Sequence, residues 1–236
     1  MTPDFFQSIP LFSHASSRTL QQVEHLAKRS FYKKGNVILD QLQCRHTFLY
    51  VAKGWLKLFK ESADGEEIIE DILTQGHYCG ESFIFDNNKT AAIYTVQSIS
   101  DLEIMTLPIT LLEQLIVEDH ALSLNFLKAT LHKKQQLNMH IEHLTIQNAA
   151  QRIGCFILRL CDDTIDQKNI TLRLPYDKIL LALRLGMQPE TFSRALTKLT
   201  KECALKIEDE YITIPELKIL MHYVCQHCSR TFPCTI

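Results

Sequence analysis

At 236 residues, with 46% hydrophobic and 22% charged side chains, the chain has room for one large domain or two of ordinary size. This composition argues against a disordered chain, and the net charge of −2 means that nucleic-acid binding requires a local basic patch. The start, MTPDFFQSIPLF, lacks the pattern of a secretory signal, and no run approaches the roughly 18 apolar residues that span a bilayer. We therefore expect a cytoplasmic protein that does not bind membranes.

The N-terminal half predicts a small antiparallel barrel. The segment SSRTLQQVEHLAKRS (16–30) is typical of a capped helix, with Leu20, Val23 and Ala27 on one face. Five of the seven glycines follow between Gly35 and Gly80. Short β-rich runs at roughly even spacing accompany them and favour a jelly roll. These runs are NVILD, TFLYVAKGWLKLFK, EEIIEDIL, AIYTVQSI and LEIMTL.

From Pro108 the pattern changes to a helical period, with no glycine before Gly154. One stripe is close to the seam of a coiled coil, although a threonine and a lysine interrupt it. A long core helix lying on the barrel is one interpretation. We favour a dimerisation helix, because apolar residues on more than one side need more than one partner. The stripe consists of Leu127, Thr130, Lys134, Leu137, Ile141 and Leu144.

The C-terminal third has the element order of a winged helix-turn-helix. A polar break, CDDTIDQKN, precedes a strand, ITLRL. Two helical segments, two short strands (ALKI and YITI) and a last helix, ELKILMHYV, follow. Helix, turn, helix and β-hairpin in this order predict a DNA-binding domain.

The stretch LPYDKILLALRLGMQPETFSRALTKL (174–199) predicts the helix-turn-helix itself. Asp177 is suited to cap the first helix, and Gly186 permits the tight turn. Gln188 stands where an N-cap belongs, and Pro189 suits the first position of the second helix. The expected buried positions are Ile179, Leu180 and Leu183 on the first helix, and Phe192, Ala195, Leu196 and Leu199 on the second.

The outward residues of the second helix have the chemistry of base reading. Arginine makes paired hydrogen bonds to guanine, glutamate accepts from cytosine, and serine reaches a base or a phosphate. Positions 175 to 206 contain six basic and three acidic residues, so the local net charge is +3. An ordinary surface helix of mixed charge is the alternative. The candidate DNA-binding residues are Gln188, Glu190, Thr191, Ser193, Arg194, Lys198 and Lys201.

These motifs resemble the catabolite-activator and fumarate–nitrate regulator (Crp/Fnr) family. GMQPETFSRALTKL, with its Glu190-x-x-Ser193-Arg194 motif, is similar to the family's recognition helix, and KKGNVILDQ, LYVAKGWLKLFK and GHYCGESF resemble its effector barrel. NAAQRIGCFILRL resembles the helix that follows its dimer seam. The resemblance implies a homodimer that binds a palindromic operator and recruits RNA polymerase. The Glu-x-x-Ser-Arg version is similar to the oxygen- and nitric-oxide-responsive branch, which reads TTGAT-type half-sites.

We therefore predict an α+β fold in which a cyclic-nucleotide-binding-like β-barrel, a jelly roll, precedes a long dimerisation helix and a winged helix-turn-helix. The predicted divisions are 1–108 for the barrel, 109–146 for the dimerisation helix, 147–224 for the DNA-binding domain and 225–236 for a cysteine-rich tail.

Only part of the family's cyclic-nucleotide ligand set is present. Gly80 and Glu81, followed by Ser82, match its Gly-Glu element, and Lys89 and Thr90 stand where the family has arginine and serine. Lysine offers a point charge to a phosphate but not the planar fork of arginine. The hydroxyls of the dimer helix are replaced by Leu137 and Asn138. An inherited pocket without a ligand and a working nucleotide pocket both remain open, and we favour the first.

The tail sequence CQHCSRTFPC predicts a metal site. Cys225, Cys228 and Cys234 have the spacing of the N-terminal cysteines that hold an iron–sulfur cluster in the oxygen-sensing branch. Cys79, Cys203 or a partner subunit are the candidates for the fourth ligand. Zinc with His227, and a redox-sensitive tail without metal, are alternatives. Haem in the barrel is a further alternative, although none of the ten histidines stands in a motif that forces ligation.

The sequence does not predict catalytic residues. It contains no Gly-rich phosphate loop, no Ser/His/Asp arrangement and no H-E-x-x-H motif. We expect a DNA-binding regulator and not an enzyme.

Overall fold

The computed structural model describes residues 6–7, 9–40, 46–65, 67–86, 94–161, 168–173, 178–208 and 211–226. It divides into two compact units, residues 1–131 and 132–236, each described here by itself. None of the described helices is both long and apolar enough to cross a membrane.

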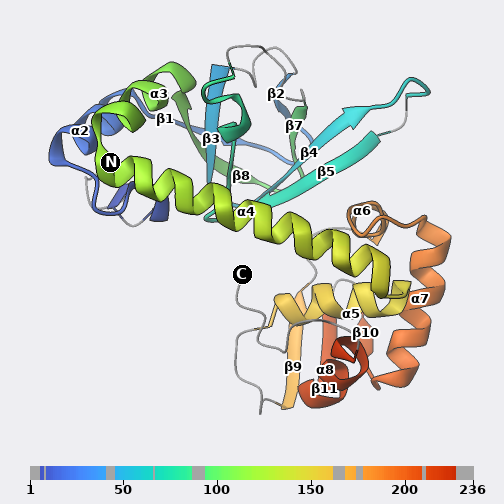
Figure 1. The fold of residues 1–236 in the computed structure, drawn as a ribbon. Helices are drawn as coiled ribbons and strands as arrows, with labels where there is room; N and C mark the ends of the chain where they lie inside the picture. The colour runs from blue at the N-terminus through green and yellow to red at the C-terminus, as the bar shows by residue number, and fades with distance from the viewer. Residues whose placement is uncertain are drawn as a thin grey trace. The chain divides into compact units, whose positions relative to one another are not determined.

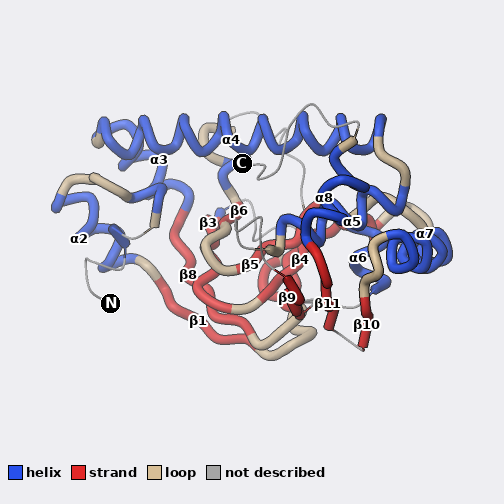
Figure 2. The backbone as a smooth tube through the Cα atoms, turned by 90° about the horizontal axis from the view of Figure 1, so that it is seen from below, coloured by secondary structure: helices blue, strands red, loops and turns tan. Residues whose placement is uncertain are grey.

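The first unit contains a jelly-roll barrel of two antiparallel sheets (Figures 1 and 2). Both sheets contribute side chains to one hydrophobic core, among them Leu49, Leu56 and Ile104. One sheet has the order β1-β8-β3-β6, with β1 at Lys28–Tyr32, β8 at Leu102–Pro108, β3 at Thr47–Lys53 and β6 at Tyr78–Cys79. The other has the order β2-β7-β4-β5, with β2 at Val37–Leu39, β7 at Thr95–Ser98, β4 at Trp55–Glu61 and β5 at Glu67–Thr74.

Helices cover the barrel beside β8. The 3-10 helix η1 (Pro10–Phe12), α2 (Ser17–Leu26) and α3 (Ile109–Glu118) bury apolar residues in the barrel core. The side chain of Ser16 caps α2 by accepting from the backbone of Thr19. The predicted helix 16–30 is too long, because Ala27 is already extended and β1 begins at Lys28, where it pairs with β8.

The stretch predicted as one helix at 109–146 is two helices in the structure. Asp119 separates α3 from α4 (His120–Ile146), with an extended backbone at φ −117° and ψ 107°. Its carboxylate accepts from the backbone N–H groups of Ala121 and Leu122, which is an N-cap for α4. Neither glycine nor proline marks this break, so the helical period runs across it without a visible interruption.

The predicted stripe on α4 is largely exposed to solvent. Leu137 and Ile141 are 63% and 61% exposed, and Leu127 and Leu144 are exposed as well. Thr130, predicted on this stripe, donates to the carbonyl of Phe126 in its own helix at 2.9 Å. Its hydroxyl is thus satisfied without a partner helix, and the exposed leucine beside it is Leu131.

The second unit has its own hydrophobic core, built from four helices and a three-stranded sheet of order β10-β11-β9. A side-chain and backbone capping box of Asn148 and Gln151 starts α5. A β-carbon on Gly154 would lie 2.5 Å from Val224 Cγ2, so the absent side chain lets α8 approach α5 closely. The elements are α5 (Ala149–Arg159), β9 (Lys168–Arg173), α6 (Lys178–Arg184), α7 (Pro189–Glu202), β10 (Lys206–Glu208), β11 (Tyr211–Glu216) and α8 (Leu217–Cys225).

Candidate functional site

Helices α6 and α7 are joined by the tight turn that the sequence predicts. Backbone N–H groups of Leu185 and Met187 donate to carbonyls of α6 at 3.0 Å. Gly186 has φ +65°, a conformation in which other residues are strained. Gln188 is the N-cap of α7 and Pro189 follows it, as predicted, although the Gln188 side chain makes no capping hydrogen bond. The turn therefore fixes where α7 begins relative to α6.

Helix α7 has one apolar and one polar side. Phe192, Ala195, Leu196 and Leu199 are buried in the core of the second unit, which confirms their predicted inward positions. Because α7 is anchored on this side, its polar side chains share one outward surface. The seven candidate DNA-binding residues are all exposed: Gln188, Glu190, Thr191, Ser193, Arg194, Lys198 and Lys201. Their role in DNA binding remains a prediction.

The predicted burial of Ile179 is wrong. It is 61% exposed, whereas Leu180 is buried as predicted, together with Leu181 and Ala182, and Leu183 is half-buried. Helix α6 is only seven residues long and begins at Lys178, so Ile179 lies in its first turn, at the edge of the core. Asp177, the predicted cap of this helix, lies outside the described residues.

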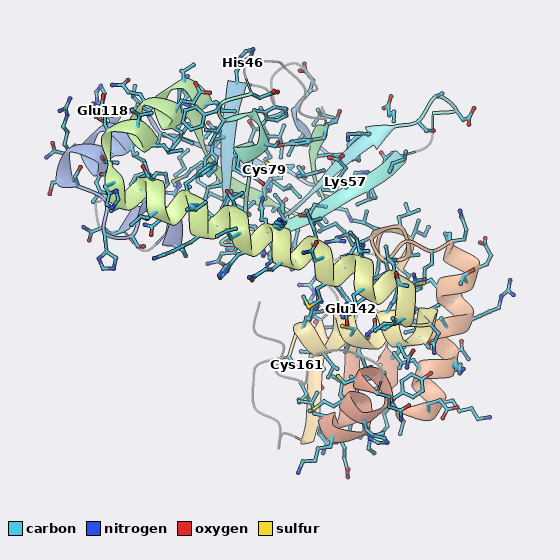
Figure 3. The ribbon with its side chains drawn as sticks, in the orientation of Figure 1. His46, Lys57, Cys79, Glu118, Glu142 and Cys161 are labelled. Atoms are coloured by element: carbon cyan, nitrogen blue, oxygen red, sulfur yellow. The ribbon has the colours of Figure 1, made fainter. Side chains whose placement is uncertain are left out.

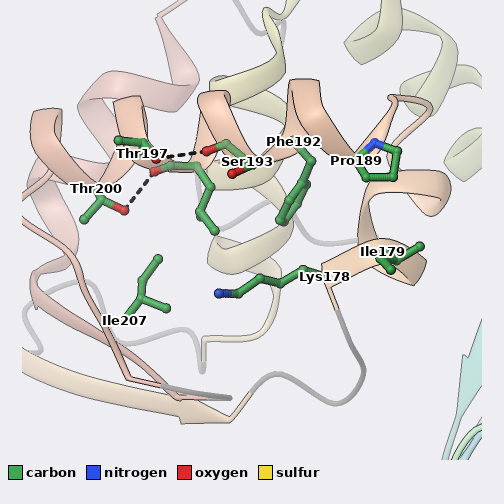
Figure 4. A pocket seen from close by; sticks show the side chains of 9 residues that line it. Lys178, Ile179, Pro189, Phe192, Ser193, Thr197, Thr200 and Ile207 are labelled. Carbon is green, nitrogen blue, oxygen red and sulfur yellow. Dashed lines mark hydrogen bonds between the residues drawn. The ribbon is translucent and has the colours of Figure 1, made fainter.

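Beside α7 lies an open hollow of about 450 Å³ that the sequence did not indicate. Figure 4 shows Lys178 extending along it in the direction of Ile207, below Ser193 and Thr197 of α7. The Thr197 hydroxyl donates to the carbonyl of Ser193 at 3.0 Å. Lys178 is one of the six basic residues between positions 175 and 206. This local positive charge is the only feature of the sequence that indicates a role for it.

A β-hairpin follows α7 as the predicted wing. Strands β10 and β11 pair antiparallel, with Ile207 opposite Ile212 and Lys206 opposite Thr213. Strand β11 also pairs with β9, which ties the hairpin to the rest of the unit. Ile212 is buried, so the hairpin is held by its inner face. The second unit thus has the helix, turn, helix and hairpin of a winged DNA-binding domain.

In the barrel, Gly80 and Glu81 occupy a tight turn. Gly80 caps the 3-10 helix η3 (Glu81–Phe83) with φ 101°, and a β-carbon there would lie 2.5 Å from the carbonyl oxygen of Thr47. Only glycine fits without displacing β3. Burial first, and then the negative charge of Glu81, raise the pKa of Tyr78 to about 12. Ser82 is exposed, and Lys89 and Thr90 lie outside the described residues.

The candidate metal ligands are only partly described. Cys225 is the last residue of α8 and packs against the core of the second unit, whereas His227, Cys228 and Cys234 lie outside the described residues. Cys203 is buried, and burial, followed by the charge of Glu202, raises the pKa of its thiol to about 11.

Cys79, labelled in Figure 3, is buried in the barrel core. Within the described part of the chain, no group of three or more His, Cys, Asp or Glu side chains is placed to hold a metal ion.

Comparison with known proteins matches both units. Residues 29–119 match the model of the cyclic nucleotide-binding domain family, and residues 151–223 match that of the Crp-like helix-turn-helix domain. The "Probable transcriptional regulator flp" of Lacticaseibacillus casei is 25% identical over 87% of this chain and 91% of its own length. The global nitrogen regulator of Nostoc sp. is 28% identical over 70% of this chain and 75% of its own.

Solved structures share the fold. FixK2 from Bradyrhizobium japonicum has a TM-score of 0.69 at 20% identity, covering 84% of this chain and 97% of its own. A CooA mutant from Carboxydothermus hydrogenoformans has a TM-score of 0.68 at 21% identity, covering 86% and 90%. The named relatives regulate transcription and are not enzymes.

Proposed function

Because the chain belongs to the Crp/Fnr family of DNA-binding transcription regulators, we propose that it acts as a homodimer on a palindromic operator with TTGAT-type half-sites. We further propose that it recruits RNA polymerase in response to a redox or gas signal. The observation that carries the proposal is α7, whose seven exposed candidate residues stand on a helix anchored by four buried ones. Two such helices related by a twofold axis fit successive major grooves.

The outward residues of α7 fall into two groups, those suited to contact bases and those suited to contact phosphates. Arg194 has the fork that pairs with guanine O6 and N7, and Glu190 accepts from cytosine N4. Gln188 and Thr191 lie in or next to the first turn, the part of a recognition helix that enters the groove first. Lys198 and Lys201, further along α7, supply charge to the phosphates.

Replacing these residues separates base reading from phosphate binding. Arg194→Ala should weaken operator binding by about 1–3 kcal/mol and relax the preference at one base pair. Lys201→Ala should weaken binding to all sequences alike and lower the salt slope by about 1. Fluorescence anisotropy on operator and random duplexes, titrated with salt, measures both effects.

Lys218→Ala, which changes an exposed lysine on α8, is the matched control. An equal loss on both duplexes for Arg194→Ala would rule out base reading.

For the signal, we propose an iron–sulfur cluster held by Cys225, Cys228 and Cys234. Cys225 supports this proposal, because it ends α8 and packs on the DNA-binding core, so a group bound there would be tied to that core. A bound cluster would supply a redox-labile centre that responds to oxygen or nitric oxide. Three close thiolates are the donor set that such clusters take, and Cys79, Cys203 or the partner subunit would supply the fourth position.

The cluster is tested by purifying the full chain without oxygen. Iron, acid-labile sulfide and visible absorption should be present and should be lost in Cys228→Ser. Cys161→Ser, at a buried thiol that donates to the Ile157 carbonyl, should keep all three. A colourless protein without iron contradicts the cluster, and iron without sulfide, with haem absorption, would favour a haem-based nitric oxide sensor.

A cyclic-nucleotide-responsive regulator is the second candidate. It is favoured by the Gly80 turn, which lies against the backbone of β3 and is followed by Glu81, in a domain that matches the cyclic nucleotide-binding family. Calorimetry with cyclic AMP, paired with operator titration, tests it. Micromolar binding that tightens operator affinity and is lost in Glu81→Gln would replace the cluster as the signal.

A further inference from the structure

A cysteine, a histidine and an arginine meet between the last turn of α4 and the C-terminal half of α5. Cys155 Sγ lies 3.9 Å from Nδ1 of His143, and Nη2 of Arg159 lies 3.5 Å from the same nitrogen. Cys155 and Arg159 are four residues apart on α5 and therefore share a face. His143 is buried, whereas Cys155 is partly exposed and Arg159 is exposed. The group therefore combines a shielded imidazole with a thiol that small solutes reach.

The contacts define the tautomer of His143. Arginine has only donors, so Nδ1 must be the accepting nitrogen and the proton sits on Nε2. The lone pair of Nδ1 thus faces the thiol of Cys155 as well. Burial first, and then the charges of Arg159 and His140, lower the pKa of His143 against the opposing effect of Glu142. At neutral pH the imidazole is consequently neutral and able to take up a proton.

We propose that Cys155 is a peroxide-reactive thiol, activated by His143 and Arg159, whose oxidation changes DNA binding. The thiol proton moves to Nδ1 of His143, and Arg159 stabilises the thiolate that remains. The thiolate sulfur attacks a peroxide oxygen, forming an S–O bond as the O–O bond breaks. Sulfur loses two electrons and becomes a sulfenic acid, and the departing oxygen takes the proton from His143 as water or an alcohol. This site is separate from the cysteine-rich tail and does not need it.

The position of Cys155 connects it to the recognition helix. It follows Gly154, where a β-carbon would lie 3.3 Å from Leu199 Cδ1 of α7, so α5 and α7 touch at the residue before Cys155. Oxidation at Cys155 is thereby placed to shift α5 and, through it, α7.

Reactivity is measured on the full chain by mass spectrometry of each cysteine peptide. The protein is treated with limiting hydrogen peroxide and labelled with a sulfenic-acid probe. Cys155 should label at least about fivefold faster than the buried Cys161 and Cys203. Arg159→Gln should slow it by about threefold to tenfold, and Arg159→Lys should restore part of the rate, because both changes act on the thiolate fraction. Equal labelling of Cys155 and Cys161, or no effect of Arg159→Gln, would overturn the proposal.

The role of His143 is tested through the pH dependence of the rate. His143→Gln removes the base, so the oxidation rate of Cys155 should depend only on the ionisation of its own thiol. The pH profile of the rate should therefore shift toward higher pH. Because His143 is buried and its replacement is able to disturb folding, Arg159→Gln, at an exposed residue, is the independent check. An unchanged profile in a folded His143→Gln protein contradicts its role as base.

The consequence for DNA binding is tested with the operator and random duplexes described above. This test therefore rests on the proposed function. Oxidised wild type should bind DNA with an affinity at least about threefold different from the reduced protein, and Cys155→Ser should not respond. The same measurement in Cys228→Ser separates this site from the tail, because the response should persist there. Labelling at Cys155 with no change in affinity on either duplex would refute the switching role.

Discussion

At the scale of single residues, Asp119 joins parts of the chain that are far apart in sequence. Its carboxylate accepts from the backbone of Ser16 at 2.8 Å and from the hydroxyl of Thr19 at 2.6 Å, and it caps α4 through Ala121 and Leu122. Burial raises the pKa of this carboxyl, but these hydrogen bonds outweigh it and lower the pKa to about 2. The ionised form is therefore the one that the folded barrel unit stabilises.

Asp119→Ala should destabilise the protein by about 2–4 kcal/mol, because it removes hydrogen bonds to a charge and a helix cap. The folded pKa lies below the unfolded one, so the charge contributes above pH 4, and its contribution is lost as pH falls toward about 2. Urea unfolding between pH 2 and 7 should show wild type and Asp119→Asn converging at the acid end. Asp101→Asn, at an exposed ion pair with Lys33, should change little. A pH-independent difference between wild type and Asp119→Asn would contradict this account.

The contrast between α7 and Asp119 shows which residue environments the sequence is able to predict. The inward and outward sides of α7 follow from its spacing alone, because Phe192 and Leu199 are apolar at helical intervals. The partners of Asp119 lie 100 and 103 residues away, and no local pattern indicates such a pairing. Ile179 was misassigned for a related reason, since in a run of apolar residues only the packing decides which of them is buried.

At the scale of elements, α7 ends in a hydrogen-bonded motif that normally contains glycine. The backbone N–H of Leu205 donates to the carbonyl of Thr200 at 3.1 Å, and that of Cys203 donates to Leu199 at 2.9 Å. The first is the 6→1 bond of a Schellman motif. Ala204, between them in the chain, has φ 52°, where a side chain is strained. The C-terminal end of α7 thus contains a residue that does not suit its backbone conformation.

Ala204→Gly should stabilise the second unit by about 0.5–1 kcal/mol, because glycine adopts this conformation without the steric penalty. The midpoint of urea unfolding should rise, and binding to operator DNA should not weaken. Ala129→Gly, within α4, is the control and should destabilise by about 1 kcal/mol. A lower midpoint for Ala204→Gly would show that the motif is not strained.

The elements themselves were partly visible in the sequence. The glycine-separated strands, the winged helix-turn-helix order and the helix start at 188 carry local signals, and the structure has them, whereas α5 was expected only from the resemblance of NAAQRIGCFILRL. The break at Asp119 was missed, because aspartate caps helices but also occurs within them. The sequence predicts residues 28–30 as the end of the preceding helix, because only the pairing with β8 makes β1 a strand.

At the scale of the whole molecule, α4 is the element that both units share, since their division falls between Leu131 and His132. Leu122, near its start, is part of the barrel core, and Met139 is buried further along. Leu137 and Ile141 lie near Met139 in sequence but point to solvent. Large aliphatic side chains so exposed on a helix indicate a contact with another chain, and a second copy of α4 is the partner that the proposed twofold operator requires.

Ile141→Lys should therefore separate the proposed dimer into monomers of 27.3 kDa, because it would place a charge in the apolar contact that we expect two chains to share. Sedimentation equilibrium measures the mass directly. Operator affinity should fall steeply, since one monomer engages one half-site, while weak binding to random DNA persists. Ile219→Lys changes an exposed isoleucine on a different helix, α8. It is the matched control and should remain dimeric. If Ile141→Lys keeps the mass of wild type while Ile219→Lys does not, the contact between chains runs through α8, and the exposed face of α4 needs another explanation.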